Sequence, residues 1–250
     1  MKKSLVITDV TRMQEGRVCI AGYDAEGRCI RPVLPPPGIQ ERTLYAQGRP
    51  IVFPFAVVEY ELTRPLPRPP HTEDHEYDPK SVRFIKHLEP DDRRETLEKS
   101  LFKTVAAIFE EPIHTDVGHY VMDGRGPRSL GTIRPQRVAR VIHEPAPDGK
   151  WQYRLRFSDS EGTTYRLTVT DLAWRYYHDR QRESGHKPEE ISTALTAALK
   201  SSEVYLRIGL ARGWDKFPDR CFLQITGVYT FPDYLDNRTF ADFAPADPPT

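Results

Sequence analysis

Arginine residues cluster at three places in this 250-residue sequence. The arginine side chain pairs bidentately with phosphate and stacks on nucleobases. Arg154, Arg156 and Arg166 alternate with apolar residues in two neighbouring stretches, so on paired strands they would point away from the core together. This spacing predicts an outward arginine face that binds nucleic acid or a nucleotide. The alternative is an ordinary solvated sheet face, whose charge nearby acidic residues partly neutralise.

The second gathering lies at 125–134, where arginines stand between glycines and hydroxyl side chains. Glycine lets backbone amides approach an anion closely, and successive amides can form an anion-binding nest. The segment lacks the Gly-Lys-Ser/Thr sequence and the following helix of a nucleotide-binding P-loop. We expect phosphate contacts from Arg128, Ser129 and Arg134, unless the segment is a plain inter-domain loop.

The third gathering surrounds Trp214, which follows a predicted strand and is flanked by Arg212 and Lys216. A cation–aromatic–cation set of this kind suits phosphate contact and base stacking. Arg207 lies on the polar face of the preceding strand, so we expect it to contribute to the same ligand surface. The alternative for Trp214 is a ring that closes one end of a barrel.

Metal ligation has one candidate segment, His71-Thr72-Glu73-Asp74-His75-Glu76. Imidazole and carboxylate together suit Mn²⁺, Fe²⁺ or Mg²⁺, which makes His71, Glu73 and Asp74 the candidate ligands. The preceding prolines argue against a helix that would align the two histidines, and the zinc motif HExxH is absent. An acidic surface loop paired with nearby arginines is the favoured interpretation, and we expect no cofactor.

Nucleophilic catalysis has no supporting motif. The sequence contains no Gly-x-Ser-x-Gly, no Gly-x-Gly-x-x-Gly and no cysteine in a glycine-rich context. We therefore assign no catalytic residue. A pair of carboxylates that meet only in the folded protein has no sequence motif, so acid–base catalysis stays an open alternative. The three cysteines form no CxxC, and we expect them to be free thiols in a reducing cytosol.

Bulk charge limits the kind of nucleic-acid binding that the chain can use. Lys and Arg number 36 and Asp and Glu also number 36, so the net charge is zero. Domains that hold long DNA by bulk attraction are usually basic, so any such site must be a local patch. The apolar run near the N-terminus is too short for a signal peptide, and no stretch approaches the roughly 20 apolar residues of a membrane span. We expect a cytoplasmic protein without a membrane partner.

The elements that must position these residues are best defined in the second half of the chain. Three predicted strands are followed by two predicted helices and two further strands. This is the strand and helix order of an OB-fold, whose second and third strands supply the usual ligand face. The predicted strands are 137–143, 151–158, 163–170, 203–211 and 221–231, and the predicted helices are 171–183 and 188–200.

The first half is also rich in strands and hairpins, with proline-rich connections between them. We expect a polar loop at 71–78, which is dense in acidic residues and histidine, and an anchored loop at 123–135, where leucine and isoleucine alternate with polar groups. The predicted strands are 4–10, 17–23, 28–34, 51–62 and 81–88, and the predicted helices are 91–100 and 101–110.

Six short stretches carry a resemblance that extends to about Tyr234. They are Thr8-Asp9-Val10-Thr11-Arg12-Met13, Arg31-Pro32-Val33, His71-Thr72-Glu73-Asp74, Arg128-Ser129-Leu130-Gly131-Thr132-Ile133-Arg134-Pro135, Asp171-Leu172-Ala173-Trp174-Arg175-Tyr176-Tyr177 and Tyr205-Leu206-Arg207-Ile208-Gly209-Leu210-Ala211-Arg212. Together they resemble the bacterial dual OB-containing domain proteins. The resemblance implies two OB-type barrels and an association with prokaryotic nucleic-acid processing or defence systems, and it supplies no catalytic residue.

These observations predict a β-rich α+β protein in which two OB-like β-barrels pack together with short helices. We expect an N-terminal OB-like domain with a helical insert at 1–122, an OB-fold domain at 123–235 and a flexible tail at 236–250. The leading hypothesis is a non-catalytic module that binds single-stranded nucleic acid or a nucleotide. The alternatives are a metal-dependent nuclease or nucleotide-modifying enzyme, and a protein-interaction subunit of a larger complex.

Overall fold

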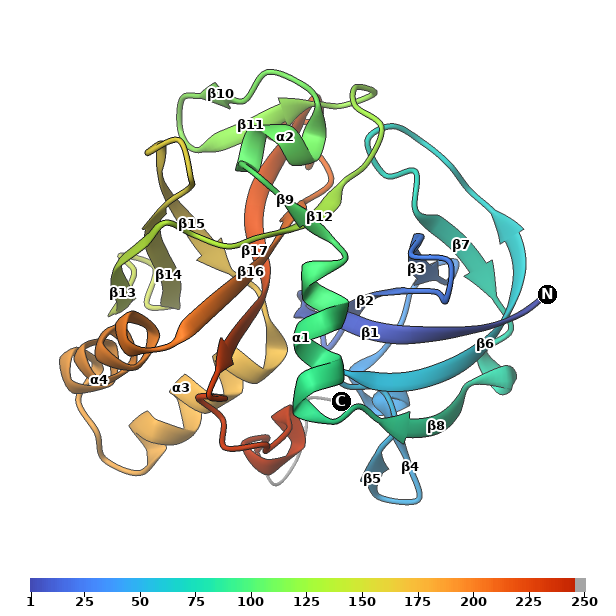
Figure 1. The fold of residues 1–250 in the computed structure, drawn as a ribbon, viewed down its shortest axis with the longest axis horizontal. Coiled ribbons are helices and arrows are strands. Elements are labelled where there is room, and N and C mark those ends of the chain that lie inside the picture. The colour runs from blue at the N-terminus through green and yellow to red at the C-terminus, as the bar shows by residue number, and fades with distance from the viewer. Residues whose placement is uncertain (246–250) are drawn as a thin grey trace.

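Two β-barrels lie side by side in the structure, with helix α1 between them (Figure 1). The structure is a computed structural model that describes residues 1–245. The strands of the first barrel are β1 (Lys2–Arg12), β2 (Val18–Tyr23), β3 (Cys29–Val33), β6 (Ala56–Pro65) and β7 (Asp74–Tyr77). Those of the second are β12 (Leu130–Ile133), β13 (Arg137–Pro145), β14 (Trp151–Ser158), β15 (Thr164–Val169), β16 (Glu203–Leu210) and β17 (Arg220–Phe231).

The first barrel has the strand order of an OB-fold. β1 pairs with β2, β2 with β3, β3 runs parallel to β7, and β7 pairs with β6, which returns to β1. An order of first, second, third, fifth and fourth strand that closes on the first is the OB topology. The parallel strand β7 lies inside the segment 71–78, which is predicted to be a loop because it is dense in acidic residues and histidine.

The second barrel repeats this order, so the prediction of two OB-like barrels with short helices is confirmed. β13, β14, β15, β17 and β16 are neighbours in turn, and β12 closes the barrel by pairing antiparallel with β16. β12 and β13 are two parts of one barrel strand, interrupted at 134–136. Pro135 has no amide hydrogen and cannot donate to a strand ladder, which accounts for the break. The closing strand β12 falls in the predicted loop 123–135.

Helices and short strands fill the connections. No helix in the described part of the chain has the length and apolar composition to cross a bilayer. The helices are α1 (Pro90–Glu98), α2 (Val105–Phe109), α3 (Leu172–Glu183) and α4 (Pro188–Ser201), with 3₁₀ turns at Glu41–Leu44, Pro79–Ser81 and Phe240–Asp242. The remaining strands are β4 (Tyr45–Ala46), β5 (Arg49–Pro50), β8 (Arg83–His87), β9 (Leu101–Phe102), β10 (His114–Thr115) and β11 (His119–Met122).

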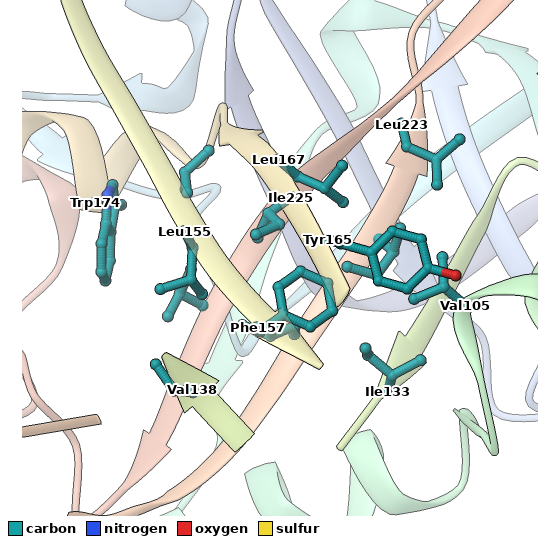
Figure 2. Close-up of a cluster of buried hydrophobic side chains, with 14 of the residues drawn as sticks. Val105, Ile133, Val138, Leu155, Phe157, Tyr165, Leu167, Trp174, Leu223 and Ile225 are labelled. Atoms are coloured by element: carbon teal, nitrogen blue, oxygen red, sulfur yellow. The ribbon is translucent and has the colours of Figure 1, made fainter. Parts of the chain in front are cut away.

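Alternation along β14 and β15 builds the core of the second barrel, as the sequence predicts. Leu155, Phe157, Tyr165 and Leu167 belong to one buried cluster (Figure 2), while the residues between them face outward. Burying one such side chain contributes about 1.5–3 kcal/mol. Trp174 on α3 reaches the same core and is fully buried.

The core of the first barrel includes residues from the far end of the chain. Leu172 and Tyr176 on α3 pack into it, as do Phe240 and Phe243 near the C-terminus. The predicted flexible tail is therefore wrong for the described residues 236–245, because two buried phenylalanine rings anchor them. The rest of the predicted tail, 246–250, lies outside the described residues.

Three short strands before residue 123 pair with the second barrel rather than the first. β9 runs parallel to β12, β10 pairs with β11, and β11 pairs with β17. Residues 101–122, which are predicted to belong to the N-terminal domain, thus contribute these three strands to the sheet of the C-terminal barrel.

An ion pair between Asp9 and Arg207 joins the two barrels at their contact. Arg207 Nη2 lies 2.8 Å from Asp9 Oδ2, and both side chains are almost fully buried. Arg207 Nη1 also donates to Tyr23 Oη and Thr132 Oγ1. Burial alone would lower the pKa of Arg207, but Asp9, Tyr23 and Cys29 together outweigh burial and raise that pKa well above its usual value.

A β-bulge on each side brings the ion pair together. β1 shifts its register against β2 between Ile7 and Asp9, and β17 shifts against β16 so that Thr226 is the extra residue. Bulges of this kind re-aim side chains. Thr226 Oγ1 donates to Asp9 Oδ1 at 2.5 Å, so the two bulges face each other across the interface.

Asp171 connects helix α3 to strand β17 of the second barrel. Its Oδ1 accepts the amides of Ala173 and Trp174 and so caps α3, while its Oδ2 accepts the amide of Val228 on β17. Burial raises the pKa of Asp171 to about 7. One side chain thereby fixes both the start of α3 and its position against β17.

Replacing Arg207 by methionine should lower the free energy of unfolding by about 3–5 kcal/mol, because Asp9 would remain as an uncompensated buried charge. Urea denaturation of both proteins measures the difference. Lys99→Met is the control, because Lys99 pairs with Glu95 on the exposed side of α1. An exposed pair of this spacing contributes only about 0.3–0.5 kcal/mol, so a similar loss in both variants would contradict the role of the buried pair.

Candidate nucleic-acid interface

A row of three arginines crosses the outer face of the second barrel. Arg140 on β13 pairs in register with Arg156 on β14, which pairs with Arg166 on β15. All three side chains are exposed. Within residues 1–245, neither Arg140 nor Arg156 forms an ion pair with a carboxylate, while Arg166 lies 3.3 Å from the half-exposed Glu144. The row is therefore a concentrated positive patch on a chain of zero net charge.

Arg154 adds a fourth cation to this face. It lies two residues from Arg156 on β14 and pairs in register with Thr168. Burial lowers the pKa of Arg154, and the neighbouring Arg166 lowers it further. We name this set of four, Arg140, Arg154, Arg156 and Arg166, the arginine face.

An aromatic group lies at the end of the barrel where β11 joins β17. Tyr120 and Phe222 pair in register and face outward, because their neighbours Val121 and Cys221 point into the core. Trp214, in the loop between β16 and β17, is 54 % exposed. Its ring contacts Phe217, and the guanidinium of Arg220 lies over both Tyr120 and Phe217. We name Tyr120, Trp214, Phe217 and Phe222 the aromatic patch.

The arginine face and the aromatic patch share one surface of the barrel. Thr168 on β15 pairs with Gln224 on the parallel strand β17. Arg166 and Phe222 each lie two residues upstream of this pair, so both point to the same side of the sheet. The loop that carries Trp214 joins the last two barrel strands, a loop that OB-folds use for ligands.

Arg207 and Ser129, both predicted to contact ligand, are fully buried. Arg207 points into the contact between the barrels and pairs with Asp9, as described above. The amide and hydroxyl of Ser129 donate to the two carboxylate oxygens of Glu73, at 2.6 and 3.0 Å. Neither side chain can reach a ligand at the surface, and the prediction for both is corrected.

Three other arginines predicted to contact ligand have partners within the protein but remain partly exposed: Arg128, Arg134 and Arg212. Arg128 donates to the carbonyl of Ile108 and to Glu110, which ties its loop to α2. Arg134 lies 3.0 Å from Glu203, with its side chain 58 % exposed. Arg212 pairs with Asp74 of the first barrel, and half of its side chain is exposed.

The proposed metal ligands are buried between the barrels and are engaged by other groups. Asp74 pairs with Arg31 at 2.6 Å and also with Arg212, and Glu73 accepts from Ser129 as above. Burial lowers the pKa of His71 to about 2, and the nearby Arg31 adds to the effect. Across residues 1–245, no group of three His, Cys, Asp or Glu side chains is arranged to hold a metal ion. The segment pairs with arginines as expected, but it is an interior strand and turn rather than a surface loop.

Sequence reasoning missed Arg140, and the cause is local. Simple alternation from the buried Val138 would point Arg140 into the core. A register shift between Val138 and Arg140 inserts one residue, so that Val138 and Val141 both face inward and Arg140 faces out. The basic character of Arg140 within an apolar strand was the available signal. The outward positions of Tyr120 and Phe222 depend on the β11–β17 pairing and had no signal in the sequence.

Replacing Arg156 by glutamine should raise stability at low salt, because like charges directly opposite on neighbouring strands destabilise a sheet. We expect a gain of about 0.2–0.5 kcal/mol at low ionic strength, which disappears at 1 M salt because the screening length falls to about 3 Å. Thermal unfolding at the two salt concentrations measures it.

Arg64→Gln is the control for this gain, because Arg64 lies 2.8 Å from Glu76 and loses a favourable partner. A loss of stability in Arg156→Gln at low salt would show that the arginine row is not under repulsion.

A family model described as a dual OB-containing domain matches residues 3–228 of the chain. The match covers both barrels and ends within β17. No curated protein matches the sequence.

Proposed function

Because the chain belongs to the dual OB-containing domain family, we propose that it is an OB-type recognition module that binds single-stranded nucleic acid on the outer face of its second barrel. The observation that carries this proposal is the arginine row Arg140–Arg156–Arg166, which continues on the same surface into the aromatic patch. Phosphates would lie along the row, and bases would stack on the exposed ring of Trp214.

The charge distribution supports local rather than bulk attraction. Of the outward positions on β13, β14 and β15, all within the described part of the chain, Glu144 alone is acidic. The chain as a whole is neutral, so long-range attraction to a duplex is weak. A neutral protein with one cationic face is suited to a short segment of strand.

Exposed aromatic rings favour a single strand over a duplex. In a duplex the base faces are stacked on one another, whereas a single strand offers them to aromatic side chains. Trp214 is more than half exposed and lies beside the cations Arg212 and Lys216. The same surface would serve a cytoplasmic protein of prokaryotic nucleic-acid processing or defence, the setting that the family resemblance suggests.

Replacing Arg140, Arg156 and Arg166 by alanine together should weaken binding of a fluorescein-labelled single-stranded oligonucleotide by at least about tenfold at low salt. The slope of log K against log salt concentration should become shallower by about 2, because three phosphate contacts are lost at about 0.7 each. Fluorescence anisotropy with DNA and RNA at four salt concentrations measures both quantities.

The control for this experiment removes the same charge from the first barrel, at Arg42, Arg49 and Lys86, which are exposed and form no ion pair within residues 1–245. Equal weakening in the two triple variants would mean that net charge, not the arginine face, governs binding. Absence of any salt-dependent binding by the wild type would overturn the proposed function.

Trp214→Ala should weaken single-strand binding by about 1–3 kcal/mol, the usual value of one base–aromatic stack, with little change in the salt slope. Trp151→Ala is the matched control, because Trp151 is 36 % exposed and the guanidinium of Arg182 already lies 4.1 Å from its ring centre. Isothermal titration calorimetry of both variants measures the effect. Unchanged affinity in Trp214→Ala would remove the aromatic patch from the binding surface.

A further inference from the structure

A polar cleft of about 500 Å³ opens beside the break in the first strand of the second barrel. One wall is the interruption between β12 and β13, and the other is the end of α4 with the start of β16. The size is within the range of small-ligand sites, roughly 300–1,000 Å³. The lining residues are Arg134, Pro135, Gln136, Arg137, Val138, Leu199, Lys200, Ser202, Glu203 and Val204.

The cations of this cleft outnumber the available carboxylate. Arg134, Arg137 and Lys200 line it, and Glu203 is its one acidic lining residue. Both oxygens of Glu203 are already used: Oε1 lies 3.0 Å from Arg134 Nη2, and Oε2 accepts from Arg94 Nε at 3.1 Å.

The other two cations of the cleft are free to bind a ligand. Within residues 1–245, neither Arg137 nor Lys200 forms an ion pair, although both are exposed at its rim. An anion can therefore enter without displacing an internal salt bridge of these two side chains.

The cleft is also continuous with the arginine face. Arg137 pairs in register with Ser158, and Arg140 pairs with Arg156, two residues away along β14. Two residues of a strand span about 7 Å, so the rim of the cleft is one short step from the arginine row. The end of a strand bound on that row would therefore be within reach of the cleft.

We propose that this cleft binds the phosphomonoester of a nucleotide, either a free mononucleotide or the terminal phosphate of a strand held on the arginine face. A phosphomonoester carries a charge of about −1.5 to −2 at pH 7, more than the single charge of an internal phosphodiester. Arg137 and Lys200 supply two cations from two different elements, which favours the more highly charged group. Pro135 and Val204 give the nucleoside an apolar contact. The strand-end form of the proposal rests on the proposed function, and the mononucleotide form does not.

The experiment compares three internally labelled single-stranded oligonucleotides of one sequence, with a 5′-phosphate, a 3′-phosphate or hydroxyls at both ends. One of the two phosphorylated strands should bind the wild type about tenfold more tightly than the hydroxyl strand. In the double variant Arg137→Ala, Lys200→Ala this ratio should fall to about one. Lys103→Ala, Lys150→Ala, which removes two exposed cations elsewhere on the same barrel, should keep the ratio.

A calorimetric titration with 5′-AMP and adenosine tests the mononucleotide form separately. Wild-type protein should bind 5′-AMP and not adenosine, and the double variant should bind neither. Binding of 5′-AMP without binding of any oligonucleotide would support the cleft and overturn the proposed function. Equal affinity for all three oligonucleotides, together with no 5′-AMP binding or with binding that the double variant keeps, would overturn the cleft and leave the arginine face standing.

Discussion

The ion pair between Asp9 and Arg207 is the interaction on which the arrangement of the two barrels depends. Two charges removed from water are stabilising only when hydrogen bonds satisfy their remaining atoms. Here Asp9 accepts from Thr8 and Thr226 as well as from Arg207, and Arg207 also donates to Tyr23 and Thr132. The partners come from β1 and β2 on one side and β12, β16 and β17 on the other, so each barrel holds part of a single network.

A polar interface of this kind fixes orientation more closely than an apolar one. Apolar surfaces can slide over one another at little cost, whereas a buried charge must meet its partner within hydrogen-bond distance. A second cluster with the same character lies nearby, where Asp74 joins Arg31 of the first barrel to Arg212 of the second. Because Arg212 precedes Trp214 by two residues, the first barrel holds the loop that carries Trp214 and Phe217, and it thereby takes part in shaping the proposed ligand surface.

Features that depend on neighbouring residues were predicted from the sequence, and features that depend on partners distant in the sequence were not. Alternation in β14 and β15 is local, and it correctly predicted both the buried Phe157 and the exposed Arg156. Arg207 shows the same alternation on β16, yet it is buried, because its partner Asp9 lies 198 residues away and strand periodicity carries no information about such a partner. The closing strand β12 was missed for a related reason, since all four of its residues are buried and it has no polar face to alternate with. Arg137 and Lys200 come together only through the packing of α4 against β13, and neither is distinguished from other surface cations by its neighbours in the sequence.

The core of the first barrel includes side chains from the second half of the chain, and this limits when the first barrel can fold during synthesis. Ribosomes deliver β1 to β7 first, but Tyr176, Phe240 and Phe243, which belong to the same core, are synthesised after all of these strands. Until then the nascent N-terminal half exposes apolar surface and an unpaired Asp9, which is the condition in which chaperones engage a chain. The core of the first barrel is therefore complete only when residues 172–243 are present, and a gene fragment that encodes the first barrel alone would specify an incomplete core.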